Sequence, residues 1–422
     1  MTTLPYPNAA NPAGRAAGLA APTAVLDAGL PAAALAVPSA ASVDVPIGRP
    51  LRVLHVVGSM FAGGVESTIL NHFQYIDTDR VVFDFLVEED SKIVPVDEIE
   101  RRGGRIYTVP PIHQLPSYLR ACERVFASAR PDIVHSHVNT LSVFPLSAAA
   151  RAGIPVRIAH SHSTTTRTEL LRHVTKQILR PFASVFPTHF AACSRHASDW
   201  LFGKRHEIGG DVFFMRNAID LDRFCFSDSR RRMLRAELSL AEGQLHVGQI
   251  GRISHQKNQR FTLEIFADLL RRRPDARLTL IGEQYNSDVA SRIESLGLTG
   301  HVNVLGVRDD VADFYSAFDV LMFPSQYEGF GIASIEAQAS DLPVLASSSV
   351  PSEADLVPEL VRHLDLSESV DVWSKTLETQ ASLRTVGTRR SRTADLAAQG
   401  YDIRTNAKML EIWYRSLANS AQ

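Results

Sequence analysis

The sequence repeats one pattern in two series: a short apolar run rich in β-branched residues, a polar turn, and then a segment with helical periodicity. The first series begins with the run at 51–57 and the second with the run at 245–250. Strands that alternate with helices form parallel sheets through right-handed crossovers. We therefore predict an α/β protein with two parallel sheets, which suits a chain of 422 residues.

The pattern also places the individual elements. In the first unit we expect strands at 51–57, 81–86, 105–109, 132–136, 156–159, 190–193 and 212–215, and helices at 66–75, 97–102, 117–129 and 169–180. In the second unit we expect strands at 245–250, 276–281, 302–305, 320–323 and 343–346, and helices at 260–272, 288–296, 311–317 and 331–339. A final helix at 403–417 can belong to either unit.

The expected domains follow from these series and from changes in composition. Residues 1–49 contain 15 Ala and 7 Pro but only four charged residues, which predicts a disordered leader. The leader lacks the basic start of a signal peptide, and a cleaved targeting segment is the alternative. We predict a first domain at 50–222, a second at 223–400, and a C-terminal helix at 401–422 that can pack back on the first. The joint at 222–242 is polar and rich in arginine, as linkers often are.

Charge and cysteine content exclude some classes of protein. The 44 basic and 46 acidic residues give a net charge of −2, so the chain is not a nucleic-acid binder that relies on a global basic field. Three widely spaced cysteines without a CxxC motif argue against a disulfide framework and a structural zinc site, and favour a reducing compartment. No apolar run reaches the ~18 residues of a spanning helix. We expect a cytoplasmic protein that can attach to the inner face of the cell membrane.

A glycine pair, Gly63 and Gly64, follows the first predicted strand at the start of a helix. Backbone N–H groups at such a site can approach an anion, and the helix dipole favours negative charge there. The spacing is not GxGxxG, and no acidic residue ends the second strand, so a dinucleotide fingerprint is poorly matched. We interpret the pair as a site for an anion or a sugar phosphate.

Two further motifs follow strands of the second unit, where ligands bind in open parallel sheets. Arg252 and Lys257 stand five residues apart after a strand, a cationic pair that suits a diphosphate. Glu328 precedes a predicted helix that carries Glu336, and Gly329 and Gly331 lie near the helix start. Carboxylates accept paired hydrogen bonds from vicinal hydroxyls, while free amides at a helix start face an anion.

Two histidine pairs, His135 with His137 and His160 with His162, lie at the ends of neighbouring predicted strands. Residues two apart on a strand share one face. Four imidazoles can in principle bind a metal ion, but no cysteine or acidic ligand is near them in sequence. We therefore favour a histidine that lines a cleft over a metal site.

The predicted helix at 169–180 carries Arg172, Lys176 and Arg180 at intervals of four residues, next to apolar side chains. This pattern is compatible with docking on an anionic bilayer. It is equally compatible with an ordinary amphipathic helix that packs on the sheet.

Taken together, the motifs around Gly63, Arg252 to Lys257, and Glu328 to Glu336 resemble those of the retaining glycosyltransferases of family 4. The resemblance is greatest to the capsular and exopolysaccharide branch, runs from about Leu51 to Leu417 and includes the segment ending at His162. It implies the GT-B fold, in which two Rossmann-like domains face each other across a cleft.

The resemblance also implies roles for single residues. Arg252 and Lys257 would hold the donor diphosphate, with Gly63 and Gly64 approaching it from the first domain. Glu336 would bind the ribose, and Glu328 with the amides of Gly329, Phe330 and Gly331 would face the donor sugar. Gly282 lies where the family surrounds the base, and Asn217 lies in an element near the cleft, although Ala218 replaces the usual glycine. One histidine lies near the donor sugar; His160 and His162 are both candidates, and we prefer His162.

We therefore expect a retaining transferase that moves a hexose or N-acetylhexosamine from a nucleotide-sugar to a lipid-linked saccharide, with UDP as the expected nucleotide. The resemblance implies no metal and no other cofactor, since family members do not use a paired-Asp metal motif; Arg, Lys and helix amides can offset the charge of the leaving diphosphate instead. The alternatives are a GT-B epimerase or phosphorylase, and a catalytically silent binding subunit of a polysaccharide complex.

Overall fold

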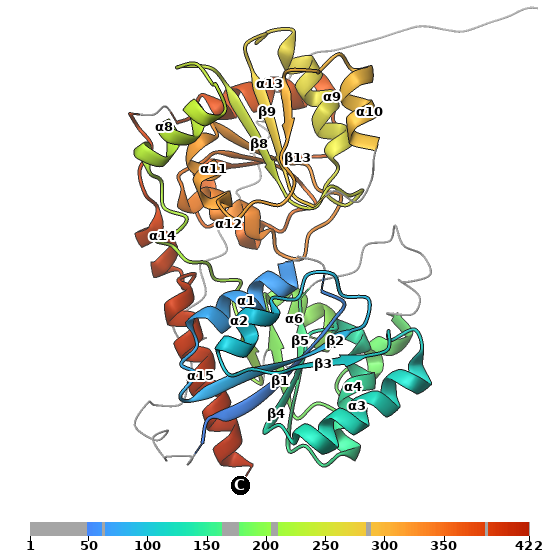
Figure 1. Cartoon of the computed structure of the whole chain (residues 1–422). Helices are drawn as coiled ribbons and strands as arrows, with labels where there is room; N and C mark the ends of the chain where they lie inside the picture. Colours follow the sequence, from blue (N-terminus) through green and yellow to red (C-terminus); the bar gives the residue numbers. More distant parts are fainter. Residues whose placement is uncertain are drawn as a thin grey trace, which may run out of the picture. The chain divides into compact units, whose positions relative to one another are not determined.

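The computed structural model describes residues 49–60, 64–162, 177–203, 210–283, 288–384 and 387–421. The predicted leader, Gly63, and most of the predicted helix at 169–180, including Arg172 and Lys176, lie outside these residues. The described chain folds into α/β structure built on two parallel sheets (Figure 1).

The first sheet has seven described strands in the order β3-β2-β1-β4-β5-β6-β7, and every neighbouring pair is parallel. The strands are β1 (Leu51–Gly58), β2 (Val81–Glu88), β3 (Ile106–Val109), β4 (Ile133–Ser136), β5 (Val156–Ser161), β6 (His189–Ala192) and β7 (Val212–Phe214). The helical segments around it are α1 (Gly64–Tyr75), α2 (Val96–Arg101), α3 (Leu115–Ala129), η3 (Asn139–Ser142), α4 (Val143–Arg151), η4 (Arg180–Phe182) and α6 (Arg195–Phe202).

The second sheet has six described strands in the order β10-β9-β8-β11-β12-β13, again all parallel. They are β8 (His246–Ile250), β9 (Arg277–Ile281), β10 (Val302–Val304), β11 (Val320–Phe323), β12 (Val344–Ser347) and β13 (Val361–Leu364). The helical segments of this half and of the C-terminus are α8 (Asp228–Glu237), α9 (Gln259–Leu270), α10 (Asp288–Ser295), α11 (Val311–Ala317), α12 (Ile332–Ala339), η5 (Ser352–Ala354), η6 (Pro358–Leu360), α13 (Val370–Ala381), α14 (Thr393–Ala398) and α15 (Ile403–Ser420).

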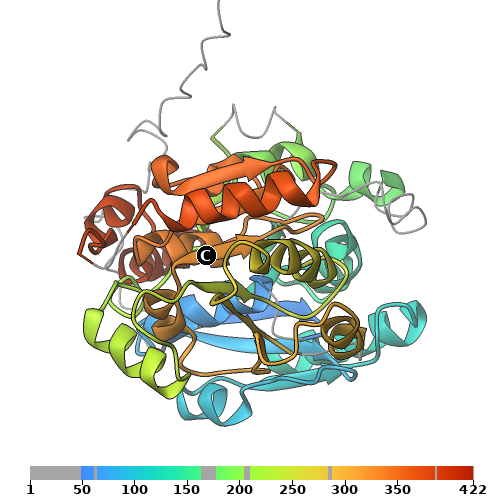
Figure 2. The same cartoon turned by 90° about the horizontal axis from the view of Figure 1, so that it is seen from above.

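Both sheets are covered on both faces by helices (Figures 1 and 2). In the first sheet α1 and α15 contribute to the core on one face, whereas α3, α4 and α6 contribute to the core on the other. In the second sheet α11 and α12 pack on one face, and α9 and α13 on the other. The strands are therefore apolar on both sides, which explains why they read as continuous hydrophobic runs.

The predicted strands and helices match the structure to within a few residues, with three differences. The sequence pattern did not identify α4, α6, β13, α13 or α14. The predicted helix at 169–180 is described only at its end, where Arg180 begins the short 3₁₀ segment η4. The joint at 222–242 is not an extended linker, because ten of its residues form helix α8. The domain boundaries themselves stay a prediction.

Helix α8 is arginine-rich because it anchors to the end of another helix. The guanidinium groups of Arg231 and Arg235 are buried and bind both carboxylate oxygens of Asp319. Arg231 also donates to the carbonyls of residues 316–318 at the end of helix α11, which have no partner within the helix and also accept from Arg235 or Arg389. A cationic side chain at a helix C-terminus is also favoured by the helix dipole. The polar composition of this segment thus reflects buried anchoring and not solvation.

The last helix, α15, packs on the first sheet and not on the second. Leu410, Tyr414 and Leu417 are buried in the same core cluster as Val53 and Ile133 of β1 and β4. The hydroxyl of Tyr414 lies 2.6 Å from Nδ1 of His135, a contact between residues 279 positions apart. The first sheet therefore includes the final residues of the described chain in its hydrophobic core.

This packing predicts a difference between two substitutions on α15. Leu410→Ala removes a fully buried side chain and should lower the free energy of unfolding by about 3 kcal/mol. Ser420→Ala, at the exposed last residue of the same helix, should change it by less than about 0.5 kcal/mol. Urea denaturation of both variants measures the difference, and equal effects would contradict the placement of α15.

Candidate functional site

Strands β8 and β9 are each followed by a glycine, which lets their carboxyl ends approach each other closely. Gly251 and Gly282 have φ angles of +141° and +149°, which side chains rarely permit. A Cβ on Gly282 would lie 2.2 Å from the carbonyl oxygen of Gly251, and a Cβ on Gly251 would lie 2.9 Å from Cε of Lys257. The two glycines thus let the Lys257 side chain cross the end of the sheet. Whether Gly282 also contacts a base stays a prediction.

The ammonium group of Lys257 reaches the loop after β11. Its Nζ lies 2.7 Å from Oε1 of Glu328 and 4.8 Å from the centre of the Phe323 ring. The two charged side chains are mostly buried, with 16% and 8% of their surfaces exposed. The sequence indicated both residues but assigned them to separate motifs; the structure brings them together as one ion pair.

Arg252 precedes Lys257 in the same loop. Its carbonyl accepts a hydrogen bond from Nε2 of Gln259, which fixes the loop against the start of α9. Within the described part of the chain, no ion pair is found for its guanidinium group. Arg252 therefore retains the capacity to bind an added anion.

Glu336 lies on α12, eight residues after Glu328, as the sequence indicated. The hydroxyl of Tyr315 donates a hydrogen bond to its Oε2 at 2.5 Å. Burial raises the pKa of Glu336 to about 7, and the hydrogen bond from Tyr315 opposes this shift. Its protonation thus changes close to neutral pH.

The loop between the two glutamates is shaped by Gly331. This residue has a φ angle of +93° and is the N-cap of α12, so Glu328 does not cap the helix. Phe330 turns its ring into the core, where it stacks on Tyr401 at 6.0 Å. The roles predicted for the Gly329, Phe330 and Gly331 amides concern the backbone and remain untested.

The first sheet approaches this loop at Gly64, the first residue of α1. A Cβ on Gly64 would lie 3.9 Å from Cδ1 of Ile332, the first residue of α12. The start of α1 and the start of α12 are therefore close. Gly63 lies outside the described residues.

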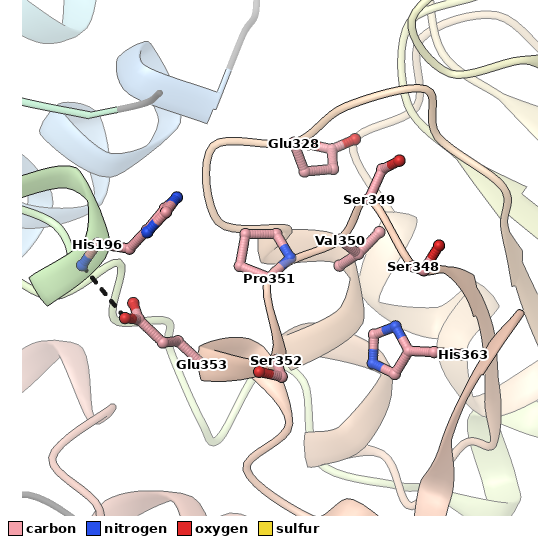
Figure 3. Close-up of a pocket in the computed structure, with 9 residues that line it drawn as sticks. All are labelled: His196, Glu328, Ser348, Ser349, Val350, Pro351, Ser352, Glu353 and His363. Carbon is pink, nitrogen blue, oxygen red and sulfur yellow. Dashed lines mark hydrogen bonds between the residues drawn. The ribbon is translucent and has the colours of Figure 1, made fainter. Parts of the chain in front are cut away.

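A pocket of about 460 Å³ lies beside Glu328 (Figure 3). On one side, the backbone N–H of His196, at the start of α6, donates a hydrogen bond to Oε1 of Glu353 at 3.2 Å. On another, His363 lies 2.9 Å from a carboxylate oxygen of Asp355, and this contact raises the pKa of the imidazole. The complete lining is His196, Glu328, Ser348, Ser349, Val350, Pro351, Ser352, Glu353 and His363.

Most of this lining was not identified from the sequence. His196 follows β6 and the segment from Ser348 to Glu353 follows β12, so both stand at carboxyl ends of strands. The same positional rule that indicated Arg252 and Glu328 also applies to them. The segment from Ser348 to Glu353 was not predicted as part of a site, because serine and proline by themselves indicate only a turn. His363 lies on β13, which the pattern did not identify.

The histidine pairs lie inside the first sheet. His160 is completely buried, and His162 is 5% exposed. Their rings stack with centres 3.8 Å apart, so both side chains lie on the same side, although His162 follows the last residue of β5. His135, His137 and His55 of β1 lie next to them, so the cluster has five members.

In two groups of three histidines, one ring nitrogen of each residue lies within 4.8 Å of the others, which is close enough in distance for metal ligands. The groups are His55 with His135 and His137, and His137 with His160 and His162. The sequence indicated four of the five residues but not His55. Burial lowers the pKa of His55 and of His162 to about 3, so both rings are neutral at physiological pH.

Asn217 is buried, and its Oδ1 accepts a hydrogen bond from Thr68 of α1 at 3.0 Å. Nearby, Tyr75 donates to Asp220. The segment from Asn217 to Asp220 therefore contacts α1 through its side chains. Asn217 is not part of the pocket lining.

Comparison with known proteins places both halves of the chain. Residues 52–198 match the family model of the glycosyl transferase 4-like domain, and residues 230–378 match that of the glycosyl transferases group 1. The structure resembles that of HepE from Anabaena, solved in complex with UDP-glucose, with a TM-score of 0.68 and 19% identity over 86% of this chain and 98% of that one. This likeness confirms the GT-B fold. No helix among the described residues has both the length and the apolar character needed to cross a bilayer.

Curated relatives point in the same direction. A putative glycosyltransferase of Bacillus subtilis, EpsF, is 31% identical over 365 residues, which cover 85% of this chain and 95% of that protein. An Escherichia coli UDP-Gal:alpha-D-GlcNAc-diphosphoundecaprenol alpha-1,3-galactosyltransferase is 21% identical over 71% of this chain and 79% of its own length. With two matching domain models and a relative of this similarity, the chain belongs to the group 1 glycosyltransferases with an N-terminal family 4-like domain.

Proposed function

We propose that the protein is a retaining glycosyltransferase that moves a hexose or N-acetylhexosamine from a UDP-sugar to a lipid-linked saccharide during polysaccharide synthesis. The observation that carries this proposal is the contact between Lys257 and Glu328, with Glu336 on the helix that follows. One edge of the sheet thus combines a cation for phosphate with two carboxylates for hydroxyl groups.

The transfer breaks the bond between the sugar C1 and the diphosphate and forms one to an acceptor oxygen, while the acceptor hydroxyl loses its proton. Negative charge accumulates on the leaving diphosphate. Arg252 and Lys257 bind this charge, and the amides at the start of α12 add to the stabilisation. These groups do so without a metal ion, and retention of configuration follows from the family resemblance.

Glu336 holds the ribose hydroxyls and Glu328 faces the donor sugar beside the pocket. A hexose fits a pocket of about 460 Å³ whose lining includes three serine hydroxyls. The printed names of similar proteins support a UDP-sugar, since HepE was solved with UDP-glucose and the E. coli relative uses UDP-Gal. That relative also acts on a diphosphoundecaprenol-linked sugar, which supports a lipid-linked acceptor.

His162 is the histidine proposed for the donor sugar, in preference to His160. Exposure supports this choice, because His162 retains some accessible surface and His160 has none. His162 also follows the end of β5, at the edge where ligands bind in parallel sheets.

A lipid-linked acceptor requires the enzyme to work at a membrane surface, and we propose peripheral attachment to the inner face of the cell membrane. In the segment that follows Lys176, Ile178, Phe182 and Val185 are all more than half exposed. Arg180 lies between them and faces Trp200. Apolar side chains with a neighbouring cation suit an anionic bilayer.

Product analysis tests the proposed reaction. The full chain is incubated with a panel of nucleotide-sugars, each with and without a diphosphoundecaprenol-linked saccharide. The expected result is a longer lipid-linked product from a UDP-sugar, with the anomeric configuration retained. An isomerised nucleotide-sugar formed without acceptor would identify an epimerase, and binding without turnover of any donor would identify a silent subunit.

In the same assay, Lys257→Ala and Glu336→Ala should each reduce turnover by at least about a hundredfold, because each removes a group that binds the donor. Thermal stabilisation by the UDP-sugar should also be lost, while the free protein still unfolds in a cooperative transition at a somewhat lower temperature, because each variant removes a buried polar contact. Lys375→Ala, which removes an exposed lysine on α13, is the matched control and should leave turnover unchanged. Turnover at the wild-type rate in both site variants would refute the assignment.

The raised pKa of Glu336 predicts pH-dependent binding of UDP. With a pKa of about 7 the carboxyl group is mostly protonated at pH 6 and mostly ionised at pH 8, and only the carboxylate accepts two hydrogen bonds from vicinal hydroxyls. UDP should therefore bind roughly tenfold more weakly at pH 6 than at pH 8, since the ionised fraction changes by about that factor. Calorimetry measures the affinity. Glu336→Gln should remove this part of the pH dependence, and what remains is that of UDP itself.

Membrane attachment predicts co-sedimentation with vesicles of phosphatidylglycerol but not with vesicles of phosphatidylcholine. Phe182→Ser should reduce the bound fraction several-fold, because it removes apolar area from the contact surface. Met233→Ser is the matched control, since Met233 is also highly exposed but lies on α8. Equal loss in both variants, or no binding by the wild type, would contradict attachment through this segment.

A further inference from the structure

Three of the five buried histidines form a continuous chain that ends at His162, the histidine proposed for the donor sugar. Nδ1 of His55 lies 2.9 Å from Nε2 of His137, and Nδ1 of His137 lies 2.8 Å from Nε2 of His162. The chain crosses from β1 to the end of β4 and then to the end of β5. At its inner end, Nε2 of His55 is buried without a hydrogen-bond partner among the described residues.

Each ring in this chain carries one proton. All three are buried, and burial lowers the pKa of each imidazole far below neutral pH. A neutral imidazole has one N–H donor and one acceptor nitrogen, so each contact needs a donor on one ring and an acceptor on the next. Because each contact joins Nδ1 of one ring to Nε2 of its neighbour, all three rings must carry their proton on the same nitrogen. The choice of tautomer at one ring therefore fixes the other two.

The ring of His162 depends on this chain for its orientation. Its backbone is held on both sides, by the Asn139 side chain, which accepts from its N–H, and by Cys193, which donates to its carbonyl. In the described structure, the one hydrogen-bond contact of the imidazole itself is with His137. The backbone contacts position the residue, whereas His137 decides which way the ring points and which nitrogen is protonated.

The ring geometry argues against a metal ion as the purpose of the cluster. The centres of the His55 and His137 rings are 5.1 Å apart, which is the N···N distance plus about one ring radius at each end. The same holds for His137 and His162, whose ring centres are 5.0 Å apart. The nitrogens thus point directly at each other, with no space for an ion between them. The rings of His160 and His162 are stacked, with centres 3.8 Å apart and planes at 20°, so their in-plane lone pairs run side by side and do not converge on one ion.

We propose that His55 and His137 are positioning residues, which hold the His162 imidazole in a single tautomer and a single orientation towards the sugar site. The role of His162 in this statement rests on the proposed function. The chain itself is a property of the free protein and can be tested without any substrate. Fixing a side chain that contacts the reacting sugar lowers the barrier because the productive geometry exists before the substrate binds.

A second hydrogen-bonded branch in the same cluster supplies the control. Tyr414 contacts Nδ1 of His135, and Nε2 of His135 lies 3.1 Å from Nδ1 of His160. This branch ends at Nε2 of His160, which is buried without a partner in the described structure. Tyr414→Phe removes only a hydroxyl from it and leaves the chain from His55 to His162 intact.

Nitrogen NMR of the full chain, labelled at the histidine rings, tests the chain directly. The expected result is one and the same tautomer for His55, His137 and His162, with no change in Tyr414→Phe. In His137→Phe, the His162 resonances should change to those of a mixture of tautomers. Different tautomers in His137 and His162 of the wild type would overturn the chain. Stoichiometric Zn²⁺ binding that shifts these resonances would overturn the preference for hydrogen bonds over a metal.

Two conservative variants test the positioning role. The side-chain amide of Asn reaches the place of imidazole Nδ1, and that of Gln reaches the place of Nε2, so His137→Asn keeps the contact with His162 and His137→Gln keeps the contact with His55. We expect kcat to fall by about tenfold in His137→Gln, because this variant loses the hydrogen bond to His162. In His137→Asn, which keeps that bond, kcat should fall clearly less. KM for the donor should change little in either variant.

A merely structural role predicts a different result, in which kcat follows the melting temperature of each variant and not the contact that it keeps. Equal kcat in the two variants and the wild type would refute the positioning role while transfer itself, and so the proposed function, stands. A wild-type protein that transfers no sugar would refute the proposed function, while the NMR result would still decide whether the chain exists.

Discussion

Every strand of the two sheets runs parallel to its neighbours, so all connections return over the faces and the carboxyl ends of neighbouring strands meet at one edge. The strands are buried on both sides, and polar groups that bind a ligand are therefore restricted to these ends. Lys257, Glu328 and His162, which are proposed to bind the donor, all follow this rule. The fold thus determines where charge can be placed, and the loops determine which charge is placed there.

The Lys257–Glu328 ion pair is the contact on which the proposed donor site depends. Its two mostly buried charges neutralise each other, which limits the desolvation cost of each. Under the proposed function, a diphosphate would meet an ammonium group already held in position by Glu328 and by the Phe323 ring. Arg252 adds a second cation without a described ion pair. Before a ligand binds, the charges of Lys257 and Glu328 are therefore already paired, which their separate motifs in the sequence did not indicate.

The sequence predicted most strands, the two parallel sheets and the family, because buried parallel strands leave long apolar runs and because glycines and charges at strand ends are conspicuous. It did not predict α8, since buried arginines that bind Asp319 look like solvated charge in a sequence. Short or amphipathic elements such as β13 and α13 also lack a clear run. His55 escaped notice because it reads as one more residue of a strand, and only the register of β1 against β4 brings it to the other histidines.

The contact between α15 and the first sheet also has a consequence for biosynthesis. Tyr414 meets His135 across 279 residues, so α15 can complete the core of the first sheet only after every strand of the second sheet has been synthesised. Until then α1 already packs on this face, but the apolar area that α15 covers stays in contact with solvent or chaperones. A chain released before α15 is made would contain all the described strands of both sheets and would still lack this part of the first core.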